Sequence, residues 1–348
     1  MNEADEEDKG VSYPPTAVLA FEQLSWLRPT KAFALFQLLE LGSLLLVIWL
    51  LVWAGESADP LSRWAKLSLS GLIVFFYPVS EQFHSGAINI MLLALLLTTM
   101  RGLQRRQDLR AGVALALASL LKVFPGITLL YLILWKRWRL IQWFLATSFI
   151  LSVITIGFVG LHNSLSYLTR LRALNLTQNG PFSLKAFVLH LFKYTLGLPL
   201  GPVGQFAYVT STAIVETIVV LLAIRGTILT SRDHDGEERS FGLWLVTMVL
   251  LSPTSWAHYG VFFIPTLVCL GSRYLKGTAP RRALVCGCGT YGLGNVIGLL
   301  FVGAINGPSL PIIGHRGYHF ASMLWVYGLF FPVGILAFAT AYFLCVEA

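Results

Sequence analysis

The stretch Arg110-AGVALALASLL-Lys122-Val-Phe-Pro125-GITLLYLILW-Lys136 is the part of the sequence that decides the expected fold. Its apolar run of about 25 residues is long enough to cross a bilayer once, at ~1.5 Å per residue. A single crossing would put two basic clusters on opposite faces of the membrane: Arg101, Arg105, Arg106 and Arg110 before the run, and Lys136, Arg137 and Arg139 after it. The positive-inside rule favours both clusters on the cytoplasmic side.

We therefore expect two short helices, one running up to Lys122 and one returning from Pro125. Proline disfavours helix at the preceding residue, here Phe124, and so predicts the turn. This arrangement places Lys122 near the outer end of a protein-lined cavity. A lysine at membrane depth costs about 2.5–3.5 kcal/mol on insertion scales, so it usually lines a cavity or pairs with an anion. Snorkelling of the side chain to the outer interface is the alternative.

The composition indicates an all-α, polytopic helical membrane protein. The 348 residues are 56% hydrophobic and 12% charged, which excludes an ordinary soluble enzyme. The apolar runs are longer than the alternating strands of an outer-membrane barrel. About 11 transmembrane segments are expected, some of them short and broken: 33–53, 65–79, 86–100, 111–121, 124–135, 141–160, 207–229, 241–253, 257–272, 283–305 and 319–345.

This reading divides the chain into an extracytoplasmic N-terminal segment, 1–31, and one polytopic domain, 32–348, with a larger outer loop at about 161–206. Within that loop, Ser183–Tyr194 has the pattern of a helix that lies at the membrane interface or packs on the bundle. The acidic start MNEADEEDKG has no apolar core and is not a signal peptide. A bacterial plasma membrane is the expected location.

The net charge of +8 is interpreted as a topology signal and not as a nucleic-acid surface. Of the 25 lysines and arginines, the two basic clusters and a further nine residues fall in predicted inner loops. The four cysteines lie in or beside predicted spans and are expected to be buried apolar residues rather than metal ligands or disulfides. No metal site and no cofactor are predicted.

Polar residues that could take part in catalysis or ligand binding gather at the predicted outer ends of the spans. One stretch, Tyr77 to Asn89, offers the carboxylate of Glu81, the imidazole of His84 and the amide of Asn89. Such groups in clefts often have functional roles, although Glu81 in an exposed loop is the simpler alternative. A second stretch, Ser252-Pro253-Thr-Ser-Trp256-Ala-His258, interrupts two short spans. Non-helical backbone at membrane depth is tolerated mainly where it lines a cavity.

In their order and spacing these motifs resemble those of glycosyltransferase family 87, the polyprenol-phosphate-mannose-dependent α-1,2-mannosyltransferases, which have the GT-C membrane fold. The matching segments are Tyr13-Pro14-Pro15, Gly86-Ala87-Ile88-Asn89, Gly112 to Lys122-Val-Phe-Pro125, Lys136-Arg137-Trp138-Arg139 and Ser252-Pro253-Thr-Ser255-Trp256-Ala-His258. Two departures stand out. Ala87 replaces a family glutamine, and the chain is expected to begin downstream of the family's first helix and of the outer loop with its catalytic aspartate.

The resemblance implies transfer of a hexose, mannose in the first instance, from a polyprenyl-phosphate donor to a lipid-linked or surface glycan outside the cell. Lys122 is expected to stabilise the leaving phosphate, with Arg170, Arg172 or Arg316 as helpers. Glu81 is the expected general base and His258 orients it or contacts the phosphate. The remaining substrate-binding candidates are Asn89, toward the sugar, His84 and Trp256.

Two other functions stay open from the residues alone. A secondary transporter or lipid flippase would also use broken helices and an intramembrane lysine, although its polar residues would centre on the midplane. A catalytically inactive relative is the second alternative. Membrane lipids are expected partners and nucleic acid is not.

Overall fold

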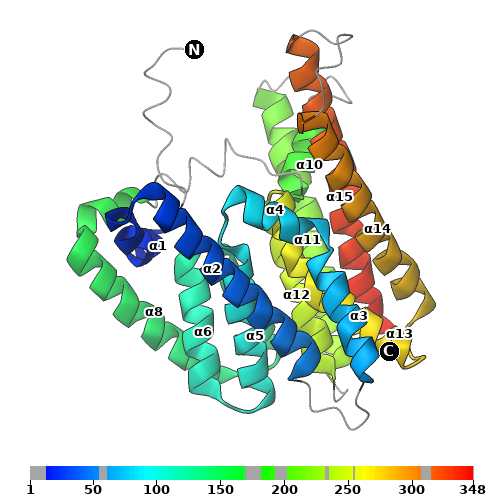
Figure 1. Cartoon of the computed structure of the whole chain (residues 1–348), viewed down its shortest axis with the longest axis horizontal. Helices are drawn as coiled ribbons and strands as arrows, with labels where there is room; N and C mark the ends of the chain where they lie inside the picture. The colour runs from blue at the N-terminus through cyan, green and yellow to red at the C-terminus, as the bar shows by residue number, and fades with distance from the viewer. Residues whose placement is uncertain are drawn as a thin grey trace.

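The computed structural model shows helices throughout the residues that it describes, which are 13–54, 61–167, 169, 182–192, 202–231, 235–253, 255–306 and 315–347 (Figure 1). For residue 202 and for 299–306 and 315–329 it describes the backbone alone. No strand occurs in these described ranges, as the all-α prediction requires.

The helices in chain order are α1 (Pro15–Phe21), η2 (Glu22–Trp26), α2 (Pro29–Ile48), η3 (Trp49–Trp53), α3 (Arg63–Val74), α4 (Tyr77–Ser85), α5 (Asn89–Gln104), α6 (Asp108–Leu121), η4 (Phe124–Ile127), α7 (Thr128–Leu134), α8 (Trp138–Val159), α10 (Leu184–His190), α11 (Pro202–Thr230), α12 (Gly236–Leu251), η6 (Ala257–Phe263), α13 (Ile264–Leu275), α14 (Arg281–Asn306) and α15 (His315–Val346). Of the short helices, η2, η4 and η6 are 3₁₀ and η3 is π-helical.

Several predicted spans are divided in the structure. The predicted span 65–79 is broken at Phe75 and Phe76, so that α3 ends there and α4 starts afresh with Pro78 in its first turn. The predicted span 257–272 consists of η6 followed by α13. The N-terminal segment contains helix as well, since Pro15 takes the first position of α1, where a missing N–H costs nothing.

The hairpin expected around Lys122 is present. Helix α6 ends at Leu121, Lys122 is extended with φ −156° and ψ 128°, and η4 and α7 lead the chain back. Arg106 and Asp108 interact electrostatically with Arg137, so the two basic clusters lie at one end of the bundle. The break at Lys122 falls between the predicted spans 111–121 and 124–135, and Pro125 fits the first turn of η4.

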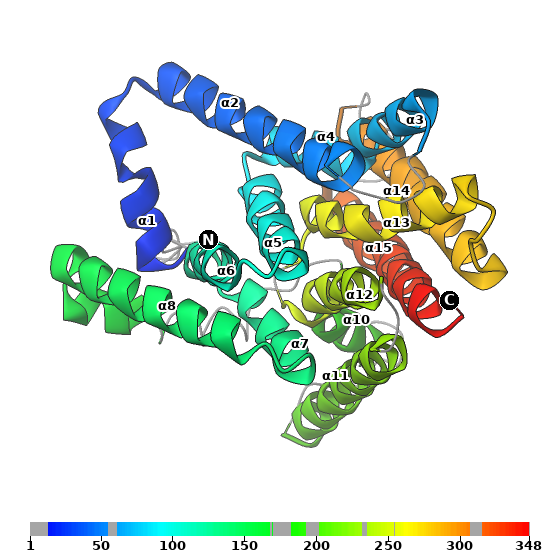
Figure 2. The ribbon, with the colours of Figure 1, turned by 90° about the horizontal axis from the view of Figure 1, so that it is seen from below.

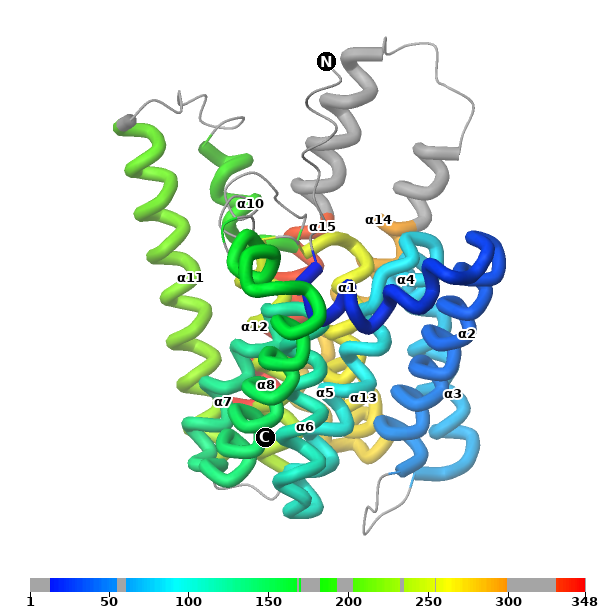
Figure 3. The backbone as a smooth tube through the Cα atoms, turned by 90° about the vertical axis from the view of Figure 1, so that its left-hand side faces the viewer, coloured from blue at the N-terminus to red at the C-terminus, as the bar shows by residue number. Residues whose placement is uncertain are grey.

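A contact of Arg101 shows which end of α2 lies at the basic end of the bundle. The Arg101 guanidinium donates to the backbone oxygen of Leu50, at 2.5 Å and 3.2 Å, so the C-terminal end of α2 and η3 lies beside the α5–α6 connection. The start of α2 lies about 30 Å away at 1.5 Å per residue, at the opposite end of the bundle. Figure 3 shows α1 and α4 near this opposite end and the turn between α5 and α6 at the basic end.

Buried and exposed apolar residues separate a central layer from a peripheral one. Nearly every residue of α12 from Arg239 to Leu250 is buried, and most of α5 is buried as well. Peripheral α2, α8 and α11 instead expose large apolar side chains, for example Leu38 at 64%, Phe149 at 71% and Leu221 at 58%. Viewed along the bundle, these helices lie on its outside (Figure 2).

Such an apolar periphery is stable only against lipid or another apolar surface. Among the residues that the structure describes, three stretches are long and apolar enough to cross a membrane: Pro29–Trp53, Trp138–Val159 and Val203–Thr230. Within the same residues, shorter apolar helical stretches are Asn89–Gln104, Phe124–Leu134 and Phe330–Val346. The chain is therefore a polytopic helical membrane protein.

Close contact between α6 and α8 depends on a glycine. A Cβ at Gly112 would lie 2.6 Å from the Cβ of Trp143 and 2.9 Å from the backbone oxygen of Leu140. Gly102 plays the same part between α5 and α6, where a Cβ would lie 2.8 Å from that of Ala111. Small residues at such contacts are the usual means of packing helices in membranes. They place α6, and with it Lys122, between α5 and α8.

We expect Gly112→Ala to destabilise the protein by about 1–3 kcal/mol, the usual cost of overpacking a tight contact. The measurement is the melting temperature of the purified protein in detergent. The matched control is Gly42→Ala in α2, where a Cβ would have nothing within 4 Å. There the smaller backbone entropy loss of alanine should leave the melting temperature unchanged or raise it. Equal melting temperatures for the two variants would contradict the close α6–α8 approach.

Candidate functional site

Lys122 lies at the end of α6 and is bound to the start of α5. Its Nζ donates a hydrogen bond of 2.9 Å to Oδ1 of Asn89, the first residue of α5. Asn89 is fully buried, whereas Lys122 is only partly buried. The amide thus holds the ammonium through one hydrogen bond and leaves two of its three N–H donors for other partners.

Three aromatic rings surround the same ammonium. The Nζ of Lys122 lies 4.2 Å from the ring centroid of Tyr259, 5.3 Å from that of Phe124 and 5.6 Å from that of Tyr13. These distances are within the range of favourable cation–π contacts. No carboxylate of the described residues forms an ion pair with Lys122. The rings therefore hold a cation whose charge is not neutralised by the protein in this part of the chain.

The rings come from three distant parts of the sequence. Tyr259 belongs to η6, after the break that Pro253 makes at the end of α12. Phe124 belongs to η4, and its ring packs 5.2 Å from that of Tyr259. Tyr13 precedes α1 and is partly buried against the core. We call Lys122, Asn89 and these three rings the lysine cage.

A buried network supports the turn that presents Asn89. Gly86 ends α4 with φ 61°, a left-handed conformation that glycine adopts without strain. Next to it, Nε2 of Gln82 donates to the backbone oxygen of Ala87 and, at 3.2 Å, to Oε2 of Glu40 in α2. Both Gln82 and Glu40 are fully buried. The α4–α5 turn is therefore fixed by hydrogen bonds two residues before Asn89.

The Trp-x-His motif lies beside the lysine cage. His258 is partly exposed, and its ring centroid lies 5.2 Å from that of Tyr259, one of the three rings around Lys122. Trp256 is 45% exposed, which leaves its indole accessible to a ligand. Ser255 is fully buried, and its backbone oxygen accepts a hydrogen bond of 3.0 Å from the N–H of Phe182.

Glu81 and His84 belong to α4, which packs directly on η6. A Cβ at Gly260 of η6 would lie 2.6 Å from Cγ of Pro78, so the two helices are in backbone contact. Glu81 is partly exposed, and its Oε2 accepts a hydrogen bond of 2.8 Å from the hydroxyl of Tyr77. His84 is exposed. The structure places Glu81 on the helix that packs against the one carrying His258.

The structure describes no side chain for the three arginines that were predicted to assist Lys122. Arg170 and Arg172 lie outside the described residues. Arg316 is in the first turn of α15, where only the backbone is described.

Sequence reasoning did not predict that the three rings surround Lys122, and it missed the Glu40–Gln82 pair. Glu40 had a visible signal, because it is the one acidic residue in the 20-residue apolar helix α2, and an ionisable residue in such a helix suggests a function or a partner. Tyr13 and Phe124 stand in the motifs quoted above and Tyr259 directly follows one, but nothing in the sequence links their rings to the ammonium. Only the packing of η4, η6 and the segment before α1 brings them to Lys122.

Comparisons with known proteins identify a family to which the chain is similar. The model of one family, described as Glycosyltransferase family 87, matches residues 12–253, which include every member of the α4, α5 and α6 part of the site. No solved structure shows significant similarity to the chain.

Curated relatives come from mycobacteria. One, named polyprenol-phosphate-mannose-dependent alpha-(1-2)-phosphatidylinositol mannoside mannosyltransferase, from Mycolicibacterium smegmatis, is 26% identical over 75% of this chain and 61% of its own length. A protein of the same name from Mycobacterium tuberculosis has the same identity and coverage. A third, the corresponding pentamannoside mannosyltransferase of M. tuberculosis, is 24% identical over 94% of this chain and 71% of its own length. The chain thus spans about 61% of the length of the first two relatives.

Proposed function

This chain belongs to glycosyltransferase family 87, and we propose that it transfers a hexose, mannose in the first instance, from a polyprenyl phosphate to a hydroxyl group of a lipid-linked or surface glycan. The names of the relatives, which specify a polyprenol-phosphate-mannose donor and a phosphatidylinositol mannoside acceptor, support this choice of substrates. The observation that carries the proposal is the lysine cage, in which the ammonium of the partly buried Lys122 has no ion-paired carboxylate among the described residues.

A phosphate monoester complements this ammonium. As the bond between the sugar C1 and the phosphate oxygen breaks, negative charge grows on the leaving polyprenyl phosphate. Preorganised donors at the place where charge develops are usually the largest contribution to catalysis. We assign Lys122 this role, with Asn89 holding the ammonium in position. His258 supplies a further hydrogen bond to the phosphate or orients the base, and Arg170, Arg172 and Arg316 remain candidates for additional phosphate contacts.

The acceptor hydroxyl attacks C1 and has to lose its proton. A carboxylate is the usual general base in such a displacement. We assign this role to Glu81, whose Tyr77 hydrogen bond fixes one oxygen and leaves the other for the acceptor. The new C1–O bond forms to the acceptor, the C1–O bond to phosphate breaks, and the proton passes to Glu81. Trp256 and His84 are exposed at the same end and are assigned to substrate contact.

We further propose that this end of the bundle faces outward from a bacterial plasma membrane. The basic clusters at the other end support this orientation through the positive-inside rule. The polyprenyl chain then enters from the outer leaflet while its phosphate reaches Lys122.

We expect Lys122→Met to reduce the release of free polyprenyl phosphate from polyprenyl-phosphate-mannose by about 10–100-fold, because a hydrogen bond to a charged group is worth about 1.5–3 kcal/mol. The assay uses purified protein with the donor and a phosphatidylinositol mannoside acceptor. The matched control is Lys66→Met, because Lys66 is also partly buried and its Nζ lies 5.5 Å from the ring centroid of Trp53, at the basic end. Unchanged turnover in Lys122→Met would refute the assignment.

For Glu81→Gln we expect transfer to fall by about 100-fold or more, the usual contribution of a general base. Donor binding should change little, since the amide keeps the shape of the carboxylate and the charge lost is not at the lysine cage. Rates and donor affinities are measured separately, by transfer of labelled mannose and by donor titration. Glu22→Gln, an exposed acid on η2 at the same end, serves as control. Equal activity in both variants would mean that another group accepts the proton.

The orientation is tested with single cysteines in a variant without the native ones. We expect a membrane-impermeant maleimide added to intact cells to label Ser25→Cys on η2, and to label Arg105→Cys and Lys136→Cys only after the membrane is opened. All three positions are exposed. Labelling of 105 and 136 from outside would reverse the proposed orientation, and labelling of these two from different sides would contradict the hairpin itself.

A further inference from the structure

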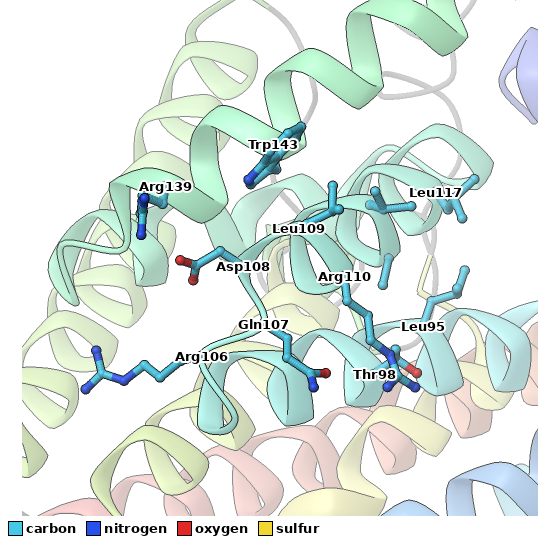
Figure 4. A pocket seen from close by; sticks show the side chains of 12 residues that line it. Leu95, Thr98, Arg106, Gln107, Asp108, Leu109, Arg110, Leu117, Arg139 and Trp143 are labelled. Atoms are coloured by element: carbon cyan, nitrogen blue, oxygen red, sulfur yellow. The ribbon is translucent and has the colours of Figure 1, made fainter.

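A second candidate site lies at the basic end of the bundle, away from the lysine cage. A pocket of about 880 Å³ opens between α5, α6 and α8. Figure 4 shows the side chains that line it. It is independent of the residues assigned to sugar transfer, because α6 carries Lys122 at one end and the pocket along its other part.

The lining of the pocket is polar at one end and apolar at the other. Along one face of α6 it contains Arg110, Val113, Ala114 and Leu117, at the i, i+3, i+4, i+7 spacing of a helix face. On α8, Arg139 is likewise followed by Trp143 one turn later. In each helix the arginine is nearer to the basic end, and the apolar residues lie deeper along the bundle.

The polar end carries an excess of positive charge. Three arginines, Arg106, Arg110 and Arg139, line the pocket together with one acid, Asp108. Figure 4 shows Arg106 and Arg139 on either side of Asp108, Arg110 extending toward Thr98 and Leu95, and Leu117 at the far side of the pocket. No ion pair or side-chain hydrogen bond of the three guanidinium groups is found in the described part of the chain. The three arginines therefore retain their donors for a ligand.

Neighbouring arginines outside the pocket form hydrogen bonds or ion pairs with other parts of the protein. Arg101 donates to Leu50 and, at 2.8 Å, to Gln104, and Arg137 forms an ion pair with Glu237. These contacts hold α5 to α2 and the α7–α8 turn to α12. The arginines that line the pocket thus differ from the adjacent ones in having no structural partner among the described side chains.

The backbone at Arg106 supports the same conclusion. Arg106 has φ 57° and follows the end of α5, where its N–H donates to Leu103 and that of Gln107 to Gly102, at 3.1 Å and 2.8 Å. This pattern is a Schellman cap, whose left-handed residue is usually glycine. An arginine at this position is less favourable for the backbone than glycine, and such costs concentrate at functional sites.

From these observations we propose that the pocket binds one anionic glycerophospholipid of the membrane leaflet at the basic end. The phosphate binds Arg106, Arg110 and Arg139, and an acyl chain lies along Val113 and Leu117 toward Trp143. Leu109, Leu117 and Trp143 are 52%, 36% and 45% exposed, so the pocket is open to the side from which a lipid arrives. Basic residues next to an apolar surface are the usual recognition pattern for anionic lipids.

The test measures lipid retention by native mass spectrometry of the full chain, after exchange into detergent and addition of phosphatidylglycerol or of phosphatidylethanolamine with the same acyl chains. We expect tighter retention of one phosphatidylglycerol. Retention should weaken roughly 100-fold in Arg106→Gln/Arg110→Gln/Arg139→Gln, since each such arginine contributes about 1 kcal/mol. The matched control, Arg63→Gln/Arg225→Gln/Arg281→Gln, removes the same charge at exposed positions outside the pocket and should stay within about threefold of the wild type.

Two further arms separate the pocket from a general attraction to charge. Leu117→Trp keeps all three arginines and fills the apolar part, so it should also weaken retention. Glycerol phosphate, which has the headgroup chemistry without acyl chains, should not displace the lipid. Equal effects of the two triple variants, equal retention of both phospholipids, displacement by glycerol phosphate or preferred binding of a polyprenyl phosphate would each overturn the proposal.

Discussion

The hydrogen bond between Lys122 and Asn89 is the interaction on which the rest of the site depends. Taking an ammonium partly out of water is costly unless its donors and charge find partners. Here one amide oxygen and three ring faces supply part of that compensation, and no carboxylate of the described residues forms an ion pair with it. The arrangement favours an anionic ligand, because a phosphate satisfies the remaining donors and the charge together.

The helical hairpin explains why one short helix serves both ends of the molecule. Helix α6 has 14 residues, too few to cross a bilayer alone, and it ends at Leu121, directly before the partly buried Lys122. Its first residues meet the basic end, where the pocket lies. Contacts at Gly102 and Gly112 hold it between α5 and α8 without room for a larger residue. The position of α6 along the membrane normal is therefore decided both by its packing between α5 and α8 and by the charged residues at its two ends.

The α4–η6 contact links the proposed base to the proposed phosphate site. Gly260 lets η6 approach Pro78, and Gln82 on α4 binds both Glu40 and the turn before Asn89. Consequently the helix of Glu81, the helix of His258 and the amide that holds Lys122 share one rigid framework. Rigid support of this kind matters for catalysis, because small displacements of reacting groups are expensive.

The sequence by itself determined the features that follow from local composition and charge: apolar helices of limited length, both basic clusters at one end, and Lys122 at a turn. These features follow from the membrane environment, because the length of apolar runs and the positions of lysine and arginine can be interpreted without knowledge of tertiary contacts. It also proposed Asn89 and His258 as site residues; Asn89 contacts Lys122, and the ring of His258 lies beside that of Tyr259. Tertiary structure alone decided that Tyr13, Phe124 and Tyr259 surround the ammonium and that Glu40 reaches Gln82. These depend on contacts between segments up to about 250 residues apart, which no local pattern records.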